Sequence, residues 1–459
     1  MYRTAIQRGV LGLLTLASVA LCLPAAAAAA GPTISPRVPQ LAPPTEPGHR
    51  PTDDRVARTL AKTAEPLSDL GPLRRMIGDA SIVGMGEATH GSHEFFRTKA
   101  RVFKELVRRD GFATFSLEAN WSAGVRLNDH VLHGKGDPRQ IMREEFQNAY
   151  FPWNTQEYLD LVRWMRGHNI RHPERPVHFM GNDSAHAGPQ LFDLVTRYVG
   201  ERHPRLLPEF TRLYRASRPP ESASVDQTMK AYLAKPLAER RELATDVQRA
   251  LTLLEQQRPH RDRDRHVWAV QHARAIAQVG TMYSFDYSTP GGTAQMMRYR
   301  DQIMAENTVW WQRQTGRRVL LSAHNGHVGY ESSNTAQYPK VQGAFLRDLV
   351  GDAYVNVGFT FGQGSFRALD LTDPAEPVRT FSVGPPEAGS AEVVLERVSR
   401  QSYTIDLRTV PSIARTWLNT ARPVRSIGAG WPDPPQAVRL APSYDVLIHL
   451  PRITPADLL

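Results

Sequence analysis

Short, largely apolar runs alternate with longer amphipathic segments along most of this chain. The runs cover residues 82–86, 113–117, 176–180, 318–323, 354–361 and 444–450. A strand that is buried on both faces reads as a continuous apolar run, and helices between such runs connect parallel strands. The pattern therefore predicts an α/β fold, with a mostly parallel sheet that helices cover on both faces.

One long interval, residues 191–316, interrupts this alternation because it contains helical periods and almost no strand pattern. We interpret it as an all-helical insertion. It would separate a first half of the α/β core, 53–190, from a second half with a C-terminal region, 317–459. Helices are expected over 54–70, 94–109, 225–254, 267–282 and 295–311.

The first thirty residues, 1–30, have the pattern of a secretory signal peptide. Arg3 and Arg8 supply positive charge, an apolar stretch runs from Val10 to Leu23, and the alanines that follow offer small-residue cleavage sites. Residues 31–52 are rich in proline and predict an extended linker. No later run reaches the roughly 20 apolar residues that cross a bilayer. We therefore expect a secreted or extracytoplasmic protein with no membrane span in the mature chain.

The single cysteine, Cys22, falls inside this predicted signal, so we expect a mature protein without a thiol. That excludes a disulfide framework, a cysteine-ligated zinc and a cysteine nucleophile. The net charge is +10, but the basic residues are scattered among acids, as in residues 261–265. Because nucleic-acid binding needs a clustered basic surface, we expect no nucleic-acid partner.

Ionisable side chains follow directly after the ends of four of the apolar runs. They are Glu87 and His90 after the first run, Glu118 after the second, Asp183 after the third, and His324 and His327 after the fourth. In a parallel sheet the carboxyl ends of neighbouring strands share one edge, where ligands bind. For Asp183 and His327 a helix cap or a turn is an equal interpretation. The other four residues together predict a shared site.

Two imidazoles and two carboxylates can hold and deprotonate a water molecule. Histidine is the natural general base near neutral pH, and a neighbouring carboxylate can fix its tautomer. A second histidine can stabilise the oxyanion of a tetrahedral intermediate. The same side chains are also ordinary ligands of zinc and manganese. These residues therefore leave two chemistries open: hydrolysis of an ester or lactone by directly activated water, and metal-dependent hydrolysis.

Several common catalytic motifs do not occur in the sequence. There is no Gly-x-Ser-x-Gly segment, which disfavours the usual serine hydrolase. His93 and Glu94 begin like a His-Glu-x-x-His zinc helix, but Arg97 stands where the second histidine would be. The chain also has no phosphate-binding loop and no dinucleotide-binding glycine fingerprint.

An ordered series of segments, from about residue 55 to the C terminus, resembles the erythromycin esterase family. GEATHG at 86–91 and HEFF at 93–96 resemble its signature, and LEANW at 117–121 resembles its second acidic element. Trp153 to Glu157 and Trp164 to Asn169 resemble its central helical block. Arg300 to Asn307 resembles the helix before its last catalytic strand, and AHNGH at 323–327 resembles the end of that strand.

The resemblance implies ester hydrolysis by activated water on an α/β fold with a helical insertion. The best known members open the lactone ring of macrolide antibiotics, an activity that gives antibiotic resistance. It also implies His90 as the general base, Glu87 and Glu118 as residues that orient this histidine and the water, and His324 as part of the site. Lys99 matches, by spacing, a basic residue that is arginine in the best known members, and lysine cannot grip an oxyanion bidentately.

Our leading hypothesis is a secreted hydrolase of carboxylic esters that acts on a small-molecule ester or a macrolide lactone and needs no cofactor. We assign substrate contacts to Trp121, Asp183 and His327. The first alternative is a metal-dependent hydrolase or peptidase that holds a divalent ion in the same glutamate and histidine cluster. The second is a non-catalytic protein that binds a glycan or a hydrophobic small molecule.

Overall fold

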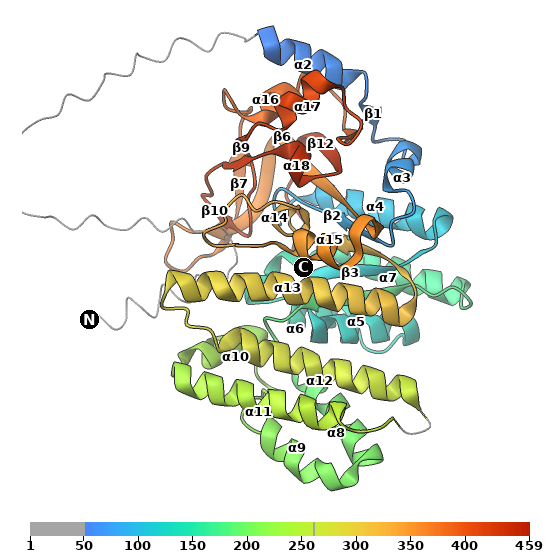
Figure 1. Cartoon of the computed structure of the whole chain (residues 1–459), viewed down its shortest axis with the longest axis vertical. Helices are drawn as coiled ribbons and strands as arrows, with labels where there is room; N and C mark the ends of the chain where they lie inside the picture. The colour runs from blue at the N-terminus through green and yellow to red at the C-terminus, as the bar shows by residue number, and fades with distance from the viewer. Residues whose placement is uncertain (1–50, 260–261) are drawn as a thin grey trace, which may run out of the picture.

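A ten-stranded mixed sheet forms the centre of the computed structural model, which describes residues 51–259 and 262–459 (Figure 1). The strands follow the order β1-β8-β12-β6-β2-β5-β3-β4, with β7 and β10 paired to β6. Neighbours from β12 to β4 are parallel, while β1, β8 and β7 pair antiparallel. The strands are β1 (Glu65–Pro66), β2 (Ile82–Met85), β3 (Phe112–Asn120), β4 (His178–Asp183), β5 (Arg318–Ser322), β6 (Tyr354–Asp370), β7 (Val378–Val383), β8 (Tyr403–Asp406), β10 (Gly430–Trp431) and β12 (Val446–Ile453). The predicted fold class, a mostly parallel sheet flanked by helices, is confirmed.

Helices cover the sheet, and a separate two-stranded sheet pairs β9 (Arg422–Val424) with β11 (Gln436–Val438). The helices before the helical interval are α2 (Pro51–Ala61), α3 (Gly71–Ile77), α4 (His93–Arg109), α5 (Trp121–His133), α6 (Pro138–Glu145), the 3-10 helix η1 (Asn148–Trp153) and α7 (Gln156–Arg171). Those after it are α14 (Asn325–Val328), α15 (Gln342–Val350), η3 (Gly351–Ala353), α16 (Ala391–Leu395), α17 (Ser412–Leu418) and α18 (Leu440–Ser443).

Between β4 and β5 the described chain is helical throughout its regular elements. These are α8 (Pro189–Arg202), η2 (Pro204–Leu206), α9 (Leu207–Tyr214), α10 (Val225–Ala234), α11 (Leu237–Glu255), α12 (Arg263–Tyr283) and α13 (Pro290–Thr315). Helices α8 to α12 gather at one end of the molecule, and α13 lies between them and the sheet (Figure 1). Because α13 also packs on β4 and β5, it belongs to the cover of the sheet as much as to the insertion.

Two predicted helices are wrong in their bounds. The helix expected over 54–70 ends at Ala61, and the chain then forms β1. The helix expected over 225–254 is divided into α10 and α11 at Lys235 and Pro236. Lys235 is extended because the residue before a proline disfavours the helical conformation, and Pro236 has no N–H to continue the helix.

The carboxyl ends of β2, β5, β3 and β4 lie side by side at one edge of the sheet. Ser322 of β5 is in register with Met85 of β2 and with Leu117 of β3. A bulge interrupts the pairing of β3 with β4 between Leu117 and Asn120, and such a bulge re-aims the side chains within it. Glu118 lies in this bulge. The topology therefore brings together the ends of four strands that are far apart in the sequence.

The predicted signal peptide, residues 1–30, lies outside the described residues, as does the predicted linker up to residue 50. Pro51 and Thr52, at the end of that predicted linker, instead begin α2. In the part of the chain that the structure describes, no helix combines the length and apolar character needed to cross a bilayer.

Candidate active site

The loop that leaves β2 carries His90 and the carboxylate that holds it. Nδ1 of His90 lies 2.6 Å from Oε1 of Glu87. Because an ionised carboxylate only accepts hydrogen bonds, Nδ1 carries a proton, and in the neutral ring the lone pair is therefore on Nε2. The imidazole is thus fixed in the tautomer that a general base needs.

Lys99, on the first turns of α4, binds the other oxygen of the same carboxylate. Its Nζ donates to Oε2 of Glu87, to Oγ of Ser322 at 3.0 Å and to the carbonyl oxygen of Ala323 at 3.3 Å. Burial lowers the pKa of Lys99, and the nearby carboxylate of Glu87 opposes that shift. Lys99 is fully buried, and its ammonium group links Glu87 to the end of β5.

Trp153, the last residue of η1, ties His90 to the end of β3. Its ring meets the imidazole edge to face, with ring centroids 4.9 Å apart. Its Nε1–H donates to the backbone carbonyl oxygen of Glu118 over 2.7 Å. Trp153 therefore sets the distance between the loop that carries His90 and the end of β3.

Glu118 is surrounded by donors and cations. Its Oε1 accepts from Nη2 of Arg300 at 2.9 Å and lies 3.3 Å from Nε2 of His327, and its Oε2 accepts from the backbone N–H of His324 at 2.9 Å. Burial raises the pKa of this carboxyl, but His327 and Arg300 outweigh burial and hold the pKa far below its usual range. Glu118 is therefore ionised at neutral pH.

Arg300, in the middle of α13, joins Glu118 to Asp183 at the end of β4. Its Nε and Nη2 donate to the carboxylate of Asp183 over 2.7–3.1 Å. Tyr150 of η1 also donates to Asp183 over 3.1 Å. The guanidinium is 1% exposed, and a buried cation of this kind is stable only because carboxylates pair with it on two sides.

His327 bridges Glu118 and Asp301, the residue after Arg300. Its Nδ1 lies 2.7 Å from Oδ1 of Asp301, and Nη1 of Arg300 lies 3.1 Å from its Nε2. Burial lowers the pKa of His327, but the carboxylates of Asp301 and Glu118 outweigh burial and raise the pKa above its ordinary value. The two carboxylates therefore favour the positively charged form of this histidine.

His324 lies next to His90, with ring centroids 5.0 Å apart, and caps α14. Its Nδ1 accepts from the N–H of Gly326 at 3.1 Å, so its Nε2 carries the proton and donates to the carbonyl oxygen of Ile427 over 3.2 Å. Burial lowers the pKa of His324 well below its ordinary value. His324 is therefore neutral, with both ring nitrogens engaged.

The structure brings together seven of the eight predicted site residues. His90, Glu87 and Lys99 form one group, and the second contains Glu118, Asp183, His324 and His327. Trp121 lies elsewhere: its Nε1–H donates to His272 over 3.1 Å, and its ring packs against Trp310 and Trp311 of α13. The substrate contact assigned to Trp121 therefore has no support from its position. Its aromatic neighbours give it a packing role.

Four further residues contact the predicted ones but have no role assigned from the sequence. They are Arg300, Asp301, Tyr150 and Trp153. The signal for Arg300 and Asp301 was present, because two adjacent charges interrupt an otherwise buried helix face, and charged residues are rarely buried without partners. Tyr150 and Trp153 lie in a short 3-10 helix that gives no regular pattern.

Both glutamates of the cluster have each oxygen occupied by donors of this chain. Glu87 accepts from His90 and Lys99, and Glu118 accepts from Arg300 and the backbone of His324. A divalent ion would have to displace a buried cation to reach either carboxylate. Within the described ranges, the grouping of side chains spaced for a metal ion lies outside this cluster, at His93, Glu157 and Asp457.

The arrangement can take a proton from water and stabilise the charge that follows. Nε2 of His90 can accept the proton, and Glu87 can stabilise the resulting imidazolium. Arg300 and His327 supply positive charge at the neighbouring strand ends, where a developing oxyanion would be favoured. These are the elements of a hydrolase that activates water directly.

Comparisons with known proteins agree with this class. The family model for erythromycin esterase matches residues 107–453, and the chain therefore belongs to the erythromycin esterase family. The matched region holds Glu118, Arg300 and both site histidines that follow β5, while Glu87 and His90 precede it. Membership supports a hydrolase of ester bonds.

Three similar proteins align with most of this chain at low sequence identity. Erythromycin esterase type II of Escherichia coli is 23% identical over 392 residues, which span 81% of this chain and 91% of the relative. A crystal structure of a succinoglycan biosynthesis protein is 25% identical with a TM-score of 0.78, and covers 90% of this chain and all of that protein. A mutant of the erythromycin esterase EreC in its open conformation is 18% identical with a TM-score of 0.65, over 86% of this chain and 96% of that one, which shows the same fold.

Proposed function

We propose that this protein hydrolyses carboxylic esters or lactones with a water molecule that His90 activates, without a covalent intermediate and without a metal ion. The observation that carries the proposal is the Glu87–His90 pair, 2.6 Å apart, in which the carboxylate holds Nδ1 and Nε2 is the ring nitrogen left to accept a proton, beside His324 and Trp153.

In the proposed reaction His90 accepts one proton from water as the water oxygen bonds to the carbonyl carbon. The carbonyl oxygen becomes an oxyanion, which the charges of Arg300 and His327 stabilise. When the tetrahedral intermediate collapses, the C–O bond to the alcohol breaks, and the alcohol oxygen takes the proton from His90. Glu87 stabilises the imidazolium between these two steps.

Lys99, in this proposal, is a positioning residue. It fixes the Glu87 carboxylate and balances its charge, and a single ammonium suffices for one carboxylate oxygen. Full burial keeps Lys99 from touching substrate. The lysine that stands for the family's arginine therefore acts on the tautomer of His90 and not on substrate recognition.

Two observations favour direct water activation over the metal-dependent alternative. Glu87 and Glu118 have no free oxygen for an ion, and His324 uses both ring nitrogens in hydrogen bonds. Treatment with a chelator is accordingly expected to leave turnover at the cluster intact at temperatures well below unfolding. A complete and metal-reversible loss of activity would favour the metallohydrolase instead.

Macrolide lactones are candidate substrates because the Escherichia coli relative is named for erythromycin. Purified protein should be incubated with a panel of macrolides and simple aryl esters, and the products analysed by mass spectrometry. The proposal predicts a product heavier than its substrate by one water for macrolides, or an acid and an alcohol for open-chain esters. Failure on every ester and lactone would contradict it.

Export is part of the proposed function. Its support is the sequence of residues 1–30, with Arg3, Arg8 and the apolar stretch that follows. Expression of the full chain in a bacterial host, followed by N-terminal sequencing of extracytoplasmic material, should give a mature chain that begins near Ala30. Recovery of uncleaved protein in the cytoplasm alone would contradict export.

A further inference from the structure

A large cavity opens beside α4 and α7. It has a volume of about 1010 Å³, and α4, α7 and the segment after β12 contribute to its wall. Its lining includes His93, Glu157 and Asp457, but none of Glu87, His90, Glu118 or His324. Neither the predicted site nor the proposed reaction uses these three residues.

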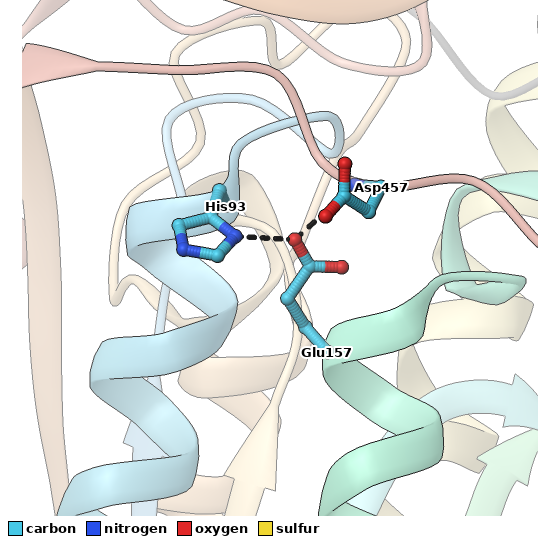
Figure 2. Close-up of side chains that lie close together, drawn as sticks. All are labelled: His93, Glu157 and Asp457. Atoms are coloured by element: carbon cyan, nitrogen blue, oxygen red, sulfur yellow. Dashed lines mark hydrogen bonds and ion pairs between the residues drawn. The ribbon is translucent and has the colours of Figure 1, made fainter.

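The three side chains meet at one point of the cavity wall (Figure 2). Nδ1 of His93 lies 2.6 Å from Oε1 of Glu157, and the backbone N–H of Asp457 donates to the same oxygen over 3.2 Å. One ligand atom from each residue lies within 4.8 Å of the other two. Two ligands about 2.1 Å from a shared zinc ion are at most about 4.2 Å apart, so small side-chain movements bring the set into range.

Glu157 gives an independent reason to expect a cation here. Its side chain is 4% exposed, and its Oε2 has no hydrogen-bond partner among the described residues. A buried carboxylate oxygen without a partner is costly. The last torsion of a glutamate is broad, so this oxygen can turn towards an ion beside Asp457. The charged residues of the cavity wall are four carboxylates and three cations, namely Glu94, Glu157, Asp160 and Asp457 against Arg97, Arg101 and Lys104.

His93 can act as a ligand after a change of tautomer. Nη1 of Arg97 approaches its Nε2 at 3.4 Å, so without an ion Nδ1 carries the proton that Glu157 accepts. Coordination through Nδ1 requires that proton to leave or to move to Nε2. The ion then replaces the proton between Nδ1 and the Glu157 carboxylate, and the long contact with exposed Arg97 is lost. Because the ligands must lose protons, affinity for the ion should increase with pH.

We propose that His93, Glu157 and Asp457 bind a divalent ion of the zinc or manganese class. Imidazole and carboxylate together suit these ions, and a three-residue set leaves further positions for water on the cavity side. The site is separate from the catalytic cluster and does not take part in ester hydrolysis.

The ion would fasten the C-terminal segment to the loop that carries His90. Backbone bonds already run from His93 N–H to the carbonyl oxygen of Thr454 at 3.0 Å, and from Ala456 N–H to that of Gly91 at 2.9 Å. The N–H of Gln156 also donates to the carbonyl oxygen of Asp457 at 2.8 Å. A metal ion adds a link among α4, α7 and this segment, and binding to the folded state alone raises stability.

The test is calorimetric titration of the chelator-treated full chain with zinc and with manganese ions, in parallel with thermal unfolding. The variants are Asp457→Asn and Glu157→Gln. The matched control is Asp160→Asn, which removes an exposed carboxylate from the wall of the same cavity. We expect one ion per chain, a raised midpoint of unfolding with the ion, and a loss of affinity of about tenfold or more in both site variants but not in the control.

Two results would overturn the proposal. One is the absence of stoichiometric binding of either ion to the folded wild type. The other is unchanged affinity in Asp457→Asn and Glu157→Gln, both shown to be folded by circular dichroism. A loss of binding in a Glu87→Gln variant, with normal binding in Asp457→Asn, would move the ion to the catalytic cluster and would count against both this site and the proposed metal-free reaction.

Discussion

Glu87 is the residue on which the chemistry of His90 depends most directly. One of its oxygens accepts from His90 and the other from Lys99, and no part of the side chain is exposed to solvent. The carboxylate therefore has one arrangement available to it. That arrangement determines which nitrogen of His90 is free to accept a proton.

Replacement of Glu87 by glutamine should lower kcat by about 10²- to 10⁴-fold, because an amide can donate to Nδ1 and so stabilise the wrong tautomer of His90. The measurement is steady-state hydrolysis of the best ester from the substrate panel. Glu105→Gln, at a surface pair with Arg108 on α4, is the matched control and should retain wild-type turnover. Similar activity in the two variants would remove Glu87 from the mechanism.

Asp433 is a buried carboxyl that the reaction does not use. Its Oδ2 accepts a long hydrogen bond, 3.4 Å, from the N–H of Gly428, and Oδ1 has no partner among the described residues. Burial raises the pKa of Asp433 to about 7. The folded state thus binds a proton that the unfolded chain releases near pH 4, so stability falls as pH rises from about 4 to 7.

Asp433→Asn should remove this pH dependence. Relative to wild type, the variant should gain on the order of 2–4 kcal/mol between pH 4 and pH 8, since one pKa unit is about 1.4 kcal/mol. Urea unfolding of both proteins at the two pH values measures the difference. Parallel stability curves for the two proteins would show that Asp433 does not titrate as described.

At the residue scale the strand pattern identified residues at strand ends, whereas from the helices only Lys99 was predicted, through the family resemblance, and Arg300 was missed. Glu87, Glu118 and His324 could be predicted because parallel strands align their carboxyl ends. Arg300 belongs to α13, and only the packing of that helix on β4 and β5 brings it to Glu118. The sequence pattern alone does not predict how α13 is oriented against the sheet.

Among the elements, the loop from β2 to α4 has the least freedom to change. Gly91 follows His90, and a Cβ on Gly91 would lie 1.9 Å from the backbone oxygen of Arg367 in β6. The N–H of Arg367 in turn donates to the carbonyl oxygen of Gly91 over 3.0 Å. Only glycine permits this close approach between the loop and the strand.

Gly91→Ala should therefore destabilise the fold by about 1–3 kcal/mol or more, as overpacking does, and should displace His90 and reduce turnover. Gly291→Ala, in the first turn of α13, is the control: a Cβ there meets nothing within 4 Å. The control should be neutral or slightly stabilising, because alanine favours helix. Chemical unfolding and activity assays on both variants test this prediction. Equal stability and equal turnover in Gly91→Ala and Gly291→Ala would contradict the close packing of Gly91 against β6.

The elements that the sequence predicted are those with strong periodic patterns. The central strands β2, β3 and β5 are buried along their whole length or nearly so, and they read as apolar runs. Strand β7 is half exposed at the edge, and β9, β10 and β11 have two or three residues each. Such short or exposed strands depend on their partners and leave little signal in composition.

For the whole molecule, acid stability depends on buried histidines that do not belong to the catalytic cluster. Burial lowers the pKa of His178, His186 and His272 to about 4. Because these folded-state pKa values lie below the unfolded value, the unfolded chain binds more protons between about pH 6.5 and 4. Stability is therefore retained above pH 6.5 and lost as pH falls towards 4.

This predicts a fall of several kcal/mol in the free energy of unfolding between pH 7 and pH 4.5. His186→Leu removes one of the three groups and should make the decline shallower, whereas His133→Leu, at an exposed position on α5, should not. Denaturant titration at a series of pH values gives both slopes. Equal slopes in the two variants would contradict the assignment to buried histidines.

At the scale of the whole molecule, the proposed function requires that the imidazole of His90, held by Glu87 at the shared strand edge, performs ester hydrolysis. The most direct test compares kcat/KM for His90→Ala with that of wild type and of His133→Ala, with thermal unfolding as the check on folding. The account predicts a loss of about 10²- to 10⁴-fold or more for His90→Ala alone, at an unchanged midpoint of unfolding. A folded His90→Ala protein that hydrolyses the same ester at the wild-type rate would contradict it.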